Sequence, residues 1–102
     1  GFATAENTIL RYIGTDKNPI VPDGITAIGK RAFTYCDIDT VELPNSLTQI
    51  GEAAFYLSTL KDIIIPKNVK KIEDDAFDWC PFLEKVTNQR KYANRFKRNF
   101  SF

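Results

Sequence analysis

The apolar positions of this chain recur at one fixed interval. The clearest marker is an Ala-Phe pair that begins at Ala32, at Ala54 and at Ala76, always 22 residues apart. The other positions that keep this step are Pro22, Pro44 and Pro66; Ile28, Ile50 and Ile72; Ile25, Leu47 and Val69; and Val21, Leu43 and Ile65. Such a repeat indicates a solenoid, because a unit this short cannot bury its own apolar face and has to stack on its neighbours.

Within each unit, one segment alternates between apolar and polar residues. The segment 40–43 shows this period of two, and residues 62–65 and 85–87 occupy the same place in the next units. Alternation of this kind is typical of a half-buried strand. Pro44 and Pro66 follow the first two segments and lack the N–H that a sheet ladder needs, so they predict the strand ends.

Two other segments carry the pattern of a single helical turn. Residues 52–55 and 73–77 each begin with acidic residues, which stabilise the N-terminal end of a helix, and each ends in Ala-Phe.

The last unit is also one residue longer than the middle one, since Cys80 precedes Leu83 by three while Ser58 precedes Leu60 by two. We therefore expect a bulge at residue 81 or 82.

The phrase Ile-Gly-x-x-Ala-Phe, at residues 28–33 and 50–55, resembles the core phrase of the BspA-like, or treponemal-type, leucine-rich repeat. The resemblance implies an α/β but β-rich fold: a right-handed leucine-rich-repeat solenoid of three 22-residue coils, with parallel strands, short helical turns and a C-terminal capping helix. Residues 1–102 would form a single domain, with an N-terminal cap at 1–20, the repeats at 21–86 and a C-terminal cap at 87–102.

The two cysteines occupy the same repeat position, two units apart. Ser58 lies at that position between Cys36 and Cys80. Stacked coils are about 4.8 Å apart, so two steps separate these residues by roughly 10 Å. A disulfide needs Cα atoms within about 7 Å, so we expect two free thiols rather than a bridge.

Catalytic and metal-binding chemistry finds little support in the sequence. The chain contains no His and no CxxC pair. The densest acidic group is Glu73, Asp74, Asp75 and Asp78, but it lacks the alternating ligand spacing of a calcium loop and is interpreted as a solvated face. We therefore expect no enzyme activity, no metal and no cofactor.

Charge is divided unevenly along the chain. Residues 1–86 hold nine of the 14 basic residues and all 13 acids, a net charge of −4, whereas residues 87–102 hold five basic residues and no acid. Tyr92, Phe96 and Phe100 are spaced by four, which predicts an amphipathic helix with an aromatic stripe. That helix either caps the end of the last coil or binds nucleic acid or an anionic membrane. We favour the cap, because an uncovered last coil would leave an open sheet edge that is prone to aggregate.

The outward side chains of the strand segments are the residues that the repeat leaves free to vary. These side chains form either a binding surface or an ordinary protein surface in which polar and apolar residues are mixed. The outward positions are Asn18, Ile20, Thr40, Glu42, Asp62, Ile64, Lys85 and Thr87, and the candidate partner-binding face consists of Ile20, Thr40, Glu42, Asp62, Ile64 and Lys85.

These observations favour a non-catalytic protein-interaction or adhesion-type scaffold whose ligand is left open. The alternatives are a purely structural spacer or array fragment, and an anionic-polymer binder acting through the basic tail; nucleic acid is the less favoured partner. No apolar run reaches the roughly 18 residues of a membrane span. The chain contains no Met, which indicates a mature or excised fragment, and the resemblance implies an extracellular or cell-surface location.

Overall fold

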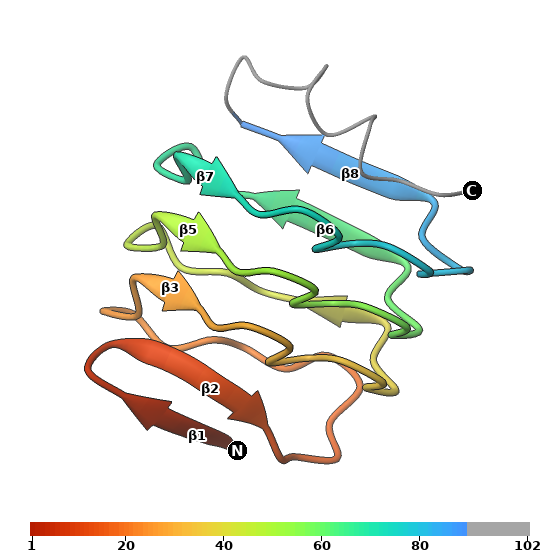
Figure 1. The fold of residues 1–102 in the computed structure, drawn as a ribbon, viewed down its shortest axis with the longest axis horizontal. Coiled ribbons are helices and arrows are strands. Elements are labelled where there is room, and N and C mark those ends of the chain that lie inside the picture. The colour runs from red at the N-terminus through yellow and green to blue at the C-terminus, as the bar shows by residue number, and fades with distance from the viewer. Residues whose placement is uncertain (90–102) are drawn as a thin grey trace.

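The computed structural model describes residues 1–89, which form a β-solenoid of about four turns (Figure 1). Each turn adds about 22 residues, and each turn after the first contributes one short strand to each of two sheets. The strands are β1 (Phe2–Ala5), β2 (Thr8–Tyr12), β3 (Ala27–Ile28), β4 (Thr40–Val41), β5 (Gln49–Ile50), β6 (Asp62–Ile65), β7 (Lys71–Ile72) and β8 (Lys85–Asn88).

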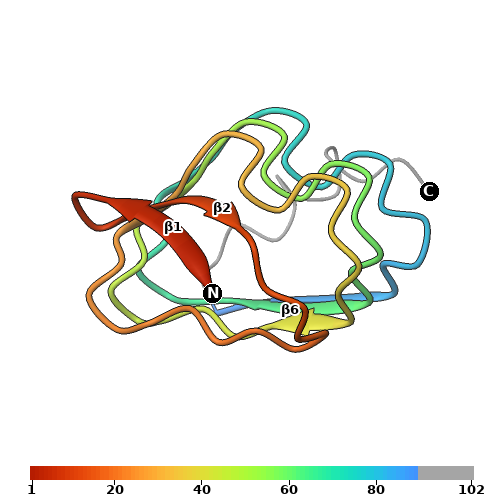
Figure 2. The ribbon, with the colours of Figure 1, turned by 90° about the horizontal axis from the view of Figure 1, so that it is seen from below.

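One sheet has the order β1-β2-β3-β5-β7 and the other has the order β4-β6-β8. All pairs are parallel except β1 with β2. The pairing follows the sequence repeat, since Ile28 lies opposite Ile50 and Ile50 lies opposite Ile72. Successive coils therefore nearly superimpose when the molecule is viewed along the stack (Figure 2).

The number of coils differs from the three that the sequence predicts. Strand β2 pairs in parallel with β3, with Ile9 opposite Ile28, and Ile20 forms a bridge to Glu42. Residues 8–21 thus form a further coil, and the antiparallel strand β1 pairs along the outer edge of β2. The repeat pattern missed this coil because its aromatic residue, Tyr12, precedes Phe33 by 21 residues rather than 22.

An aromatic column fills the centre of the stack. Phe33 and Phe55 have ring centroids 4.9 Å apart, and Phe55 and Phe77 have centroids 5.3 Å apart. Tyr12 extends the column at a centroid distance of 5.6 Å from Phe33. The three phenylalanines are at most 1% exposed, so each coil adds one fully buried aromatic side chain to the core.

The expected helical turns at residues 52–55 and 73–77 are absent, and no helix occurs within residues 1–89. Ala53 and Asp75 have positive φ angles of 54° and 61°, which right-handed helices do not contain. The N–H of Ala53 donates to Asp74 O of the next coil and that of Phe55 to Ala76 O. Alternate residues bond to the neighbouring coil, which prevents the local i to i−4 pattern of a helix.

The last coil contains the expected extra residue. Lys61 N donates to Asp39 O, 22 residues earlier, whereas Glu84 N donates to Lys61 O, 23 residues earlier. Pro81 and Phe82 are both exposed at the point where the residue is added.

The expected C-terminal capping helix and the basic aromatic tail fall in residues 90–102 and lie outside the described residues. The division into residues 1–20, 21–86 and 87–102 stays a prediction.

Candidate partner-binding face

The sheet β4-β6-β8 presents two rows of outward side chains. The first row contains Thr40, Asp62 and Lys85, because the strand register places each opposite the next. Asn18 extends this row, since the Thr40 Oγ1–H donates to Asn18 Oδ1 at 2.8 Å. The row therefore combines an amide, a hydroxyl, a carboxylate and an ammonium group over four coils.

The second row alternates between apolar and polar residues. Ile20 bridges Glu42, and Ile64 lies opposite Thr87. The register of β4 with β6 continues this row from Glu42 to Ile64. Ile20 and Ile64 are 64% and 56% exposed, which is high for isoleucine. The row presents two exposed aliphatic side chains with a carboxylate between them.

The inward residues of the same strands form the core. In β6, Ile63 is 2% exposed and Ile65 is fully buried, while Asp62 and Ile64 face outward. The side chains of β6 thus alternate between the core and the outer side of the sheet, while the role of the outer side as a partner-binding face stays a prediction. Its six members are brought onto one sheet, with Thr40 half-buried and the others exposed: Ile20, Thr40, Glu42, Asp62, Ile64 and Lys85.

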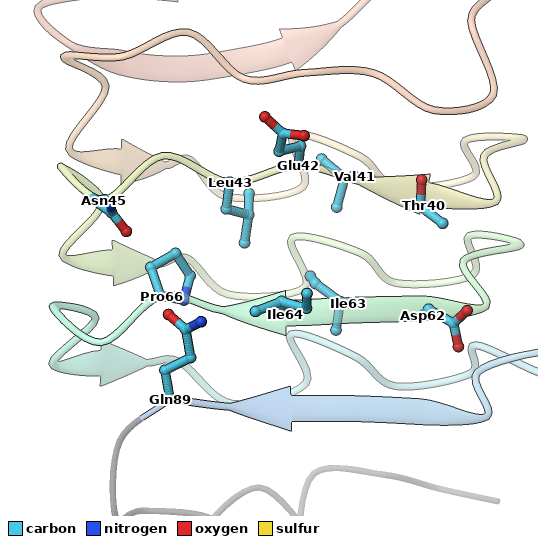
Figure 3. A pocket seen from close by; sticks show the side chains of 10 residues that line it. All are labelled: Thr40, Val41, Glu42, Leu43, Asn45, Asp62, Ile63, Ile64, Pro66 and Gln89. Carbon is cyan, nitrogen blue, oxygen red and sulfur yellow. The ribbon is translucent and has the colours of Figure 1, made fainter.

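A hollow of about 320 Å³ lies over this sheet (Figure 3). Four of the six candidate residues line it, namely Thr40, Glu42, Asp62 and Ile64, whereas Ile20 and Lys85 lie outside its lining. The remaining lining residues are Val41, Leu43, Asn45, Ile63, Pro66 and Gln89.

Sequence reasoning missed the residues that close one end of the hollow. Asn45, Pro66 and Gln89 all follow the strands, and Figure 3 shows the Gln89 side chain extending toward Pro66, while Thr40 and Asp62 lie at the other end. The N–H of Gln89 donates to Ile65 O at 3.1 Å, which continues the ladder beyond β8. The prolines that end the strands were the available signal for Asn45, which follows Pro44, and for Pro66 itself, whereas Gln89 follows no proline and carried no such signal.

The electrostatic character of the hollow is acidic. Glu42 and Asp62 are both exposed, and neither belongs to the four ion pairs found in residues 1–89. Leu43 and Ile64 supply aliphatic surface beside these carboxylates. The arrangement is suited to a cationic group that carries or adjoins apolar atoms.

The thiols offer no reactive alternative to this face. Cys36 and Cys80 are both free, as the repeat spacing predicts. Burial raises the pKa of both thiols above the ordinary value, so at neutral pH they are protonated and weakly nucleophilic. The Cys80 Sγ–H donates to Phe55 O at 3.0 Å, which gives it a structural role.

The described part of the chain shows neither a metal site nor a membrane span. No three side chains of the Cys, Asp and Glu type come together within residues 1–89 in a way that could hold a metal ion. The same residues contain no helix long and apolar enough to cross a bilayer.

The sequence profile of the BspA type leucine-rich repeat region matches residues 10–102 in six copies. The chain belongs to the BspA-type leucine-rich repeat family. Members of leucine-rich repeat families are typically non-catalytic. No match was found among the curated proteins.

Solved structures of bacterial leucine-rich repeat proteins share the fold of this BspA-type chain. A leucine-rich cell surface protein from Faecalibacterium prausnitzii is 36% identical, with a TM-score of 0.71 over 74% of this chain and 20% of that one. A leucine-rich repeat protein from Eubacterium ventriosum is 24% identical, with a TM-score of 0.75 over 84% of this chain and 24% of that one. The chain thus spans about a fifth to a quarter of these proteins.

Proposed function

We propose that this BspA-type repeat module is a non-catalytic interaction module of an extracellular or cell-surface protein. The observation that carries the proposal is the hollow on the β4-β6-β8 sheet, where Glu42 and Asp62 lie beside Ile64. The similarity to a Faecalibacterium cell surface protein supports the location. The partner would be a protein segment that presents a Lys or Arg side chain next to apolar residues.

The physical basis of recognition would be the combination of charge and apolar contact. A basic side chain could approach Glu42 and Asp62, because both carboxylates are exposed and outside the ion pairs of the described residues. The apolar neighbours of that side chain would cover Ile20 and Ile64, which are more than half exposed. Contacts of this kind confer orientation through charge and affinity through apolar burial.

A displayed library of random 12-residue peptides tests this function without a known partner. The protein is immobilised, and recovered peptides are compared for binding to the wild type and to an Ile20→Ser, Glu42→Gln, Ile64→Ser variant. We expect recovered peptides to contain Lys or Arg beside apolar residues and to lose most of their affinity for the variant. A matched control, Gln49→Ser with Lys70→Ala, changes exposed residues of the first sheet region and should bind normally.

Two outcomes would contradict the proposal. Peptides that bind the variant as well as the wild type would place recognition elsewhere on the molecule. A library that yields no binder at all would favour the alternative of a structural spacer without a ligand.

A further inference from the structure

Another row of apolar side chains, exposed at both ends, lies outside both sheets, in the connections that follow β3, β5 and β7. It consists of Tyr35, Leu57 and Trp79, which are separated by 22 residues and therefore occupy the same place in three successive coils. Tyr35 is 73% exposed and Trp79 is 61% exposed, while Leu57 between them is partly buried. We call this row the aromatic stripe.

The backbone of the aromatic stripe is in the left-handed region at every step. The φ angles are 58° at Tyr35, 58° at Leu57 and 55° at Trp79. Bulky residues rarely adopt this conformation, which Gly and Asn adopt at less cost. Hydrogen bonds hold it in place, since Tyr35 N donates to Tyr56 O at 3.0 Å and Leu57 N donates to Asp78 O at 3.2 Å.

The fold itself does not require large apolar side chains at such positions. A second left-handed row runs through the same connections at Arg31, Ala53 and Asp75, with φ between 54° and 61°. Its members are a basic, a small and an acidic residue, so the backbone conformation accepts polar side chains. The aromatic stripe thus combines a strained backbone with exposed apolar surface, and the packing of the core explains neither its Tyr nor its Trp. Strained residues that persist in this way are often found at ligand-binding sites.

The size of the aromatic stripe limits what it can bind. Two aromatic side chains of this exposure present on the order of 300 Å² of surface. A stable protein interface needs about 800 Å² from each partner, so the stripe alone is too small for one. It suits a narrow, rigid ligand that makes its contacts through flat faces.

The chemistry of the aromatic stripe suits a sugar chain. The C–H groups on one face of a pyranose ring stack on an aromatic ring, and two coil steps place the backbone positions of Tyr35 and Trp79 roughly 10 Å apart. This separation is similar to the length of a disaccharide unit in an extended glycan. Within residues 1–89, the Tyr35 hydroxyl and the Trp79 N–H make no hydrogen bond, so both can bond to sugar hydroxyls.

Polar groups follow the aromatic stripe along the chain. Asp37 lies two residues after Tyr35 and accepts hydrogen bonds from the Lys17 ammonium and the Thr59 hydroxyl. The hydrogen bond from Lys17 is the main reason that the pKa of Asp37 is lowered. Asp37 is therefore an ionised, hydrogen-bonded carboxylate two residues along the chain from Tyr35, of a kind that can accept hydrogen bonds from sugar hydroxyls.

We propose that the aromatic stripe is a binding site for an extended β-1,4-linked glycan, with pyranose rings stacked on Tyr35 and Trp79. This site is separate from the face on β4-β6-β8. Trp79 is the only tryptophan of the chain, so its fluorescence reports directly on the site.

Titration of the full chain with cellohexaose and with chitohexaose, followed by Trp79 fluorescence, tests the proposal. We expect at least one of the two sugars to change the fluorescence in a saturable way, and the curved α-linked maltohexaose to have no effect. The variants Tyr35→Asn and Trp79→Asn keep a residue that tolerates the left-handed conformation. By calorimetry, the double variant should bind about tenfold more weakly or worse, because two stacking contacts are lost.

The matched control is Arg31→Asn with Asp75→Asn, which changes the other left-handed row. This control should bind the sugar like the wild type, and equal melting temperatures show that all variants fold. The proposal is overturned if neither extended sugar binds at millimolar concentration, if only maltohexaose binds, or if the double Asn variant retains full affinity. It is also overturned if only peptides from the displayed library change the fluorescence of Trp79.

Discussion

Phe55 lies parallel to Phe77, with ring centroids 5.3 Å apart and an angle of 3° between the ring planes. Phe33 stacks on the other side of Phe55 at 4.9 Å. The middle ring is therefore enclosed by two aromatic neighbours from adjacent coils. This contact couples the coils to one another, because each ring is buried only when its neighbours are in place.

Substitution Phe55→Ala is predicted to lower the free energy of unfolding by about 3–5 kcal/mol, since it leaves a cavity between two rings. Urea denaturation monitored by circular dichroism measures the change. Phe55→Leu retains most of the volume and should cost clearly less. A denaturation curve barely changed by Phe55→Ala would contradict the aromatic column.

Adjacent residues of β6 provide a matched test of which side faces outward. Ile63→Ser should lower the free energy of unfolding by about 3–5 kcal/mol, because Ile63 is 2% exposed and the change adds a cavity and a buried hydroxyl. Ile64→Ser should change it by less than about 0.5 kcal/mol, because Ile64 is 56% exposed. Similar losses for both would refute the assigned orientation of the candidate face.

The stability of the protein is predicted to fall in alkaline solution. Burial raises the pKa of the Cys80 thiol above its ordinary 9.0, so the unfolded chain releases this proton at a lower pH than the folded chain. The contribution of Cys80 to stability is complete below pH 9.0 and is lost as the pH rises toward the folded-state pKa. Burial raises the pKa of Cys36 and of Tyr12 in the same direction.

Cys80→Ser isolates this effect, because Ser58 occupies the same repeat position in the preceding coil and is fully buried. The variant should fold and should lose less stability than the wild type between neutral pH and about one unit above the ordinary thiol pKa. Thermal melting across this range provides the measurement. An equal loss in both proteins would show that Cys80 does not contribute.

Removal of residues 90–102 is predicted to reduce solubility. This segment, with its Tyr92, Phe96 and Phe100 spacing, is proposed to cover the last coil, where Ile72 and Val86 are half-buried. Soluble yield and gel filtration measure the effect. A soluble, stable truncated protein that has lost salt-dependent nucleic-acid binding would instead support a binding role for the tail.

The sequence predicts the repeat length, the aromatic column and the strand β6 because equivalent side chains stack directly on one another. It does not predict the turns at residues 52–55, where acids before Ala-Phe suggest a helix. There, hydrogen bonds between coils decide the backbone, and no local pattern reveals them. Short strands such as Ala27–Ile28 contain too few residues to show alternation.

The candidate face could be predicted only in part, because the sequence reveals its strands but not its corners. The outward orientation of Asp62 and Ile64 follows from the period of two, but the hollow also depends on Asn45 and Gln89. These residues lie beyond the strand ends of different coils, and only the path of the chain through the corners brings them to one site. The aromatic stripe was missed because Tyr35, Leu57 and Trp79 share a position but not a residue type.

We propose that partner proteins bind to the outward side of β4-β6-β8. The most direct test is a titration of the ¹⁵N-labelled chain with a basic peptide recovered from the displayed library, followed by amide chemical shifts. The largest shifts are expected on Thr40 to Leu43 and on Asp62 to Ile64, with the first sheet unaffected. Largest shifts at β3, β5 and β7, or along the aromatic stripe, would contradict it.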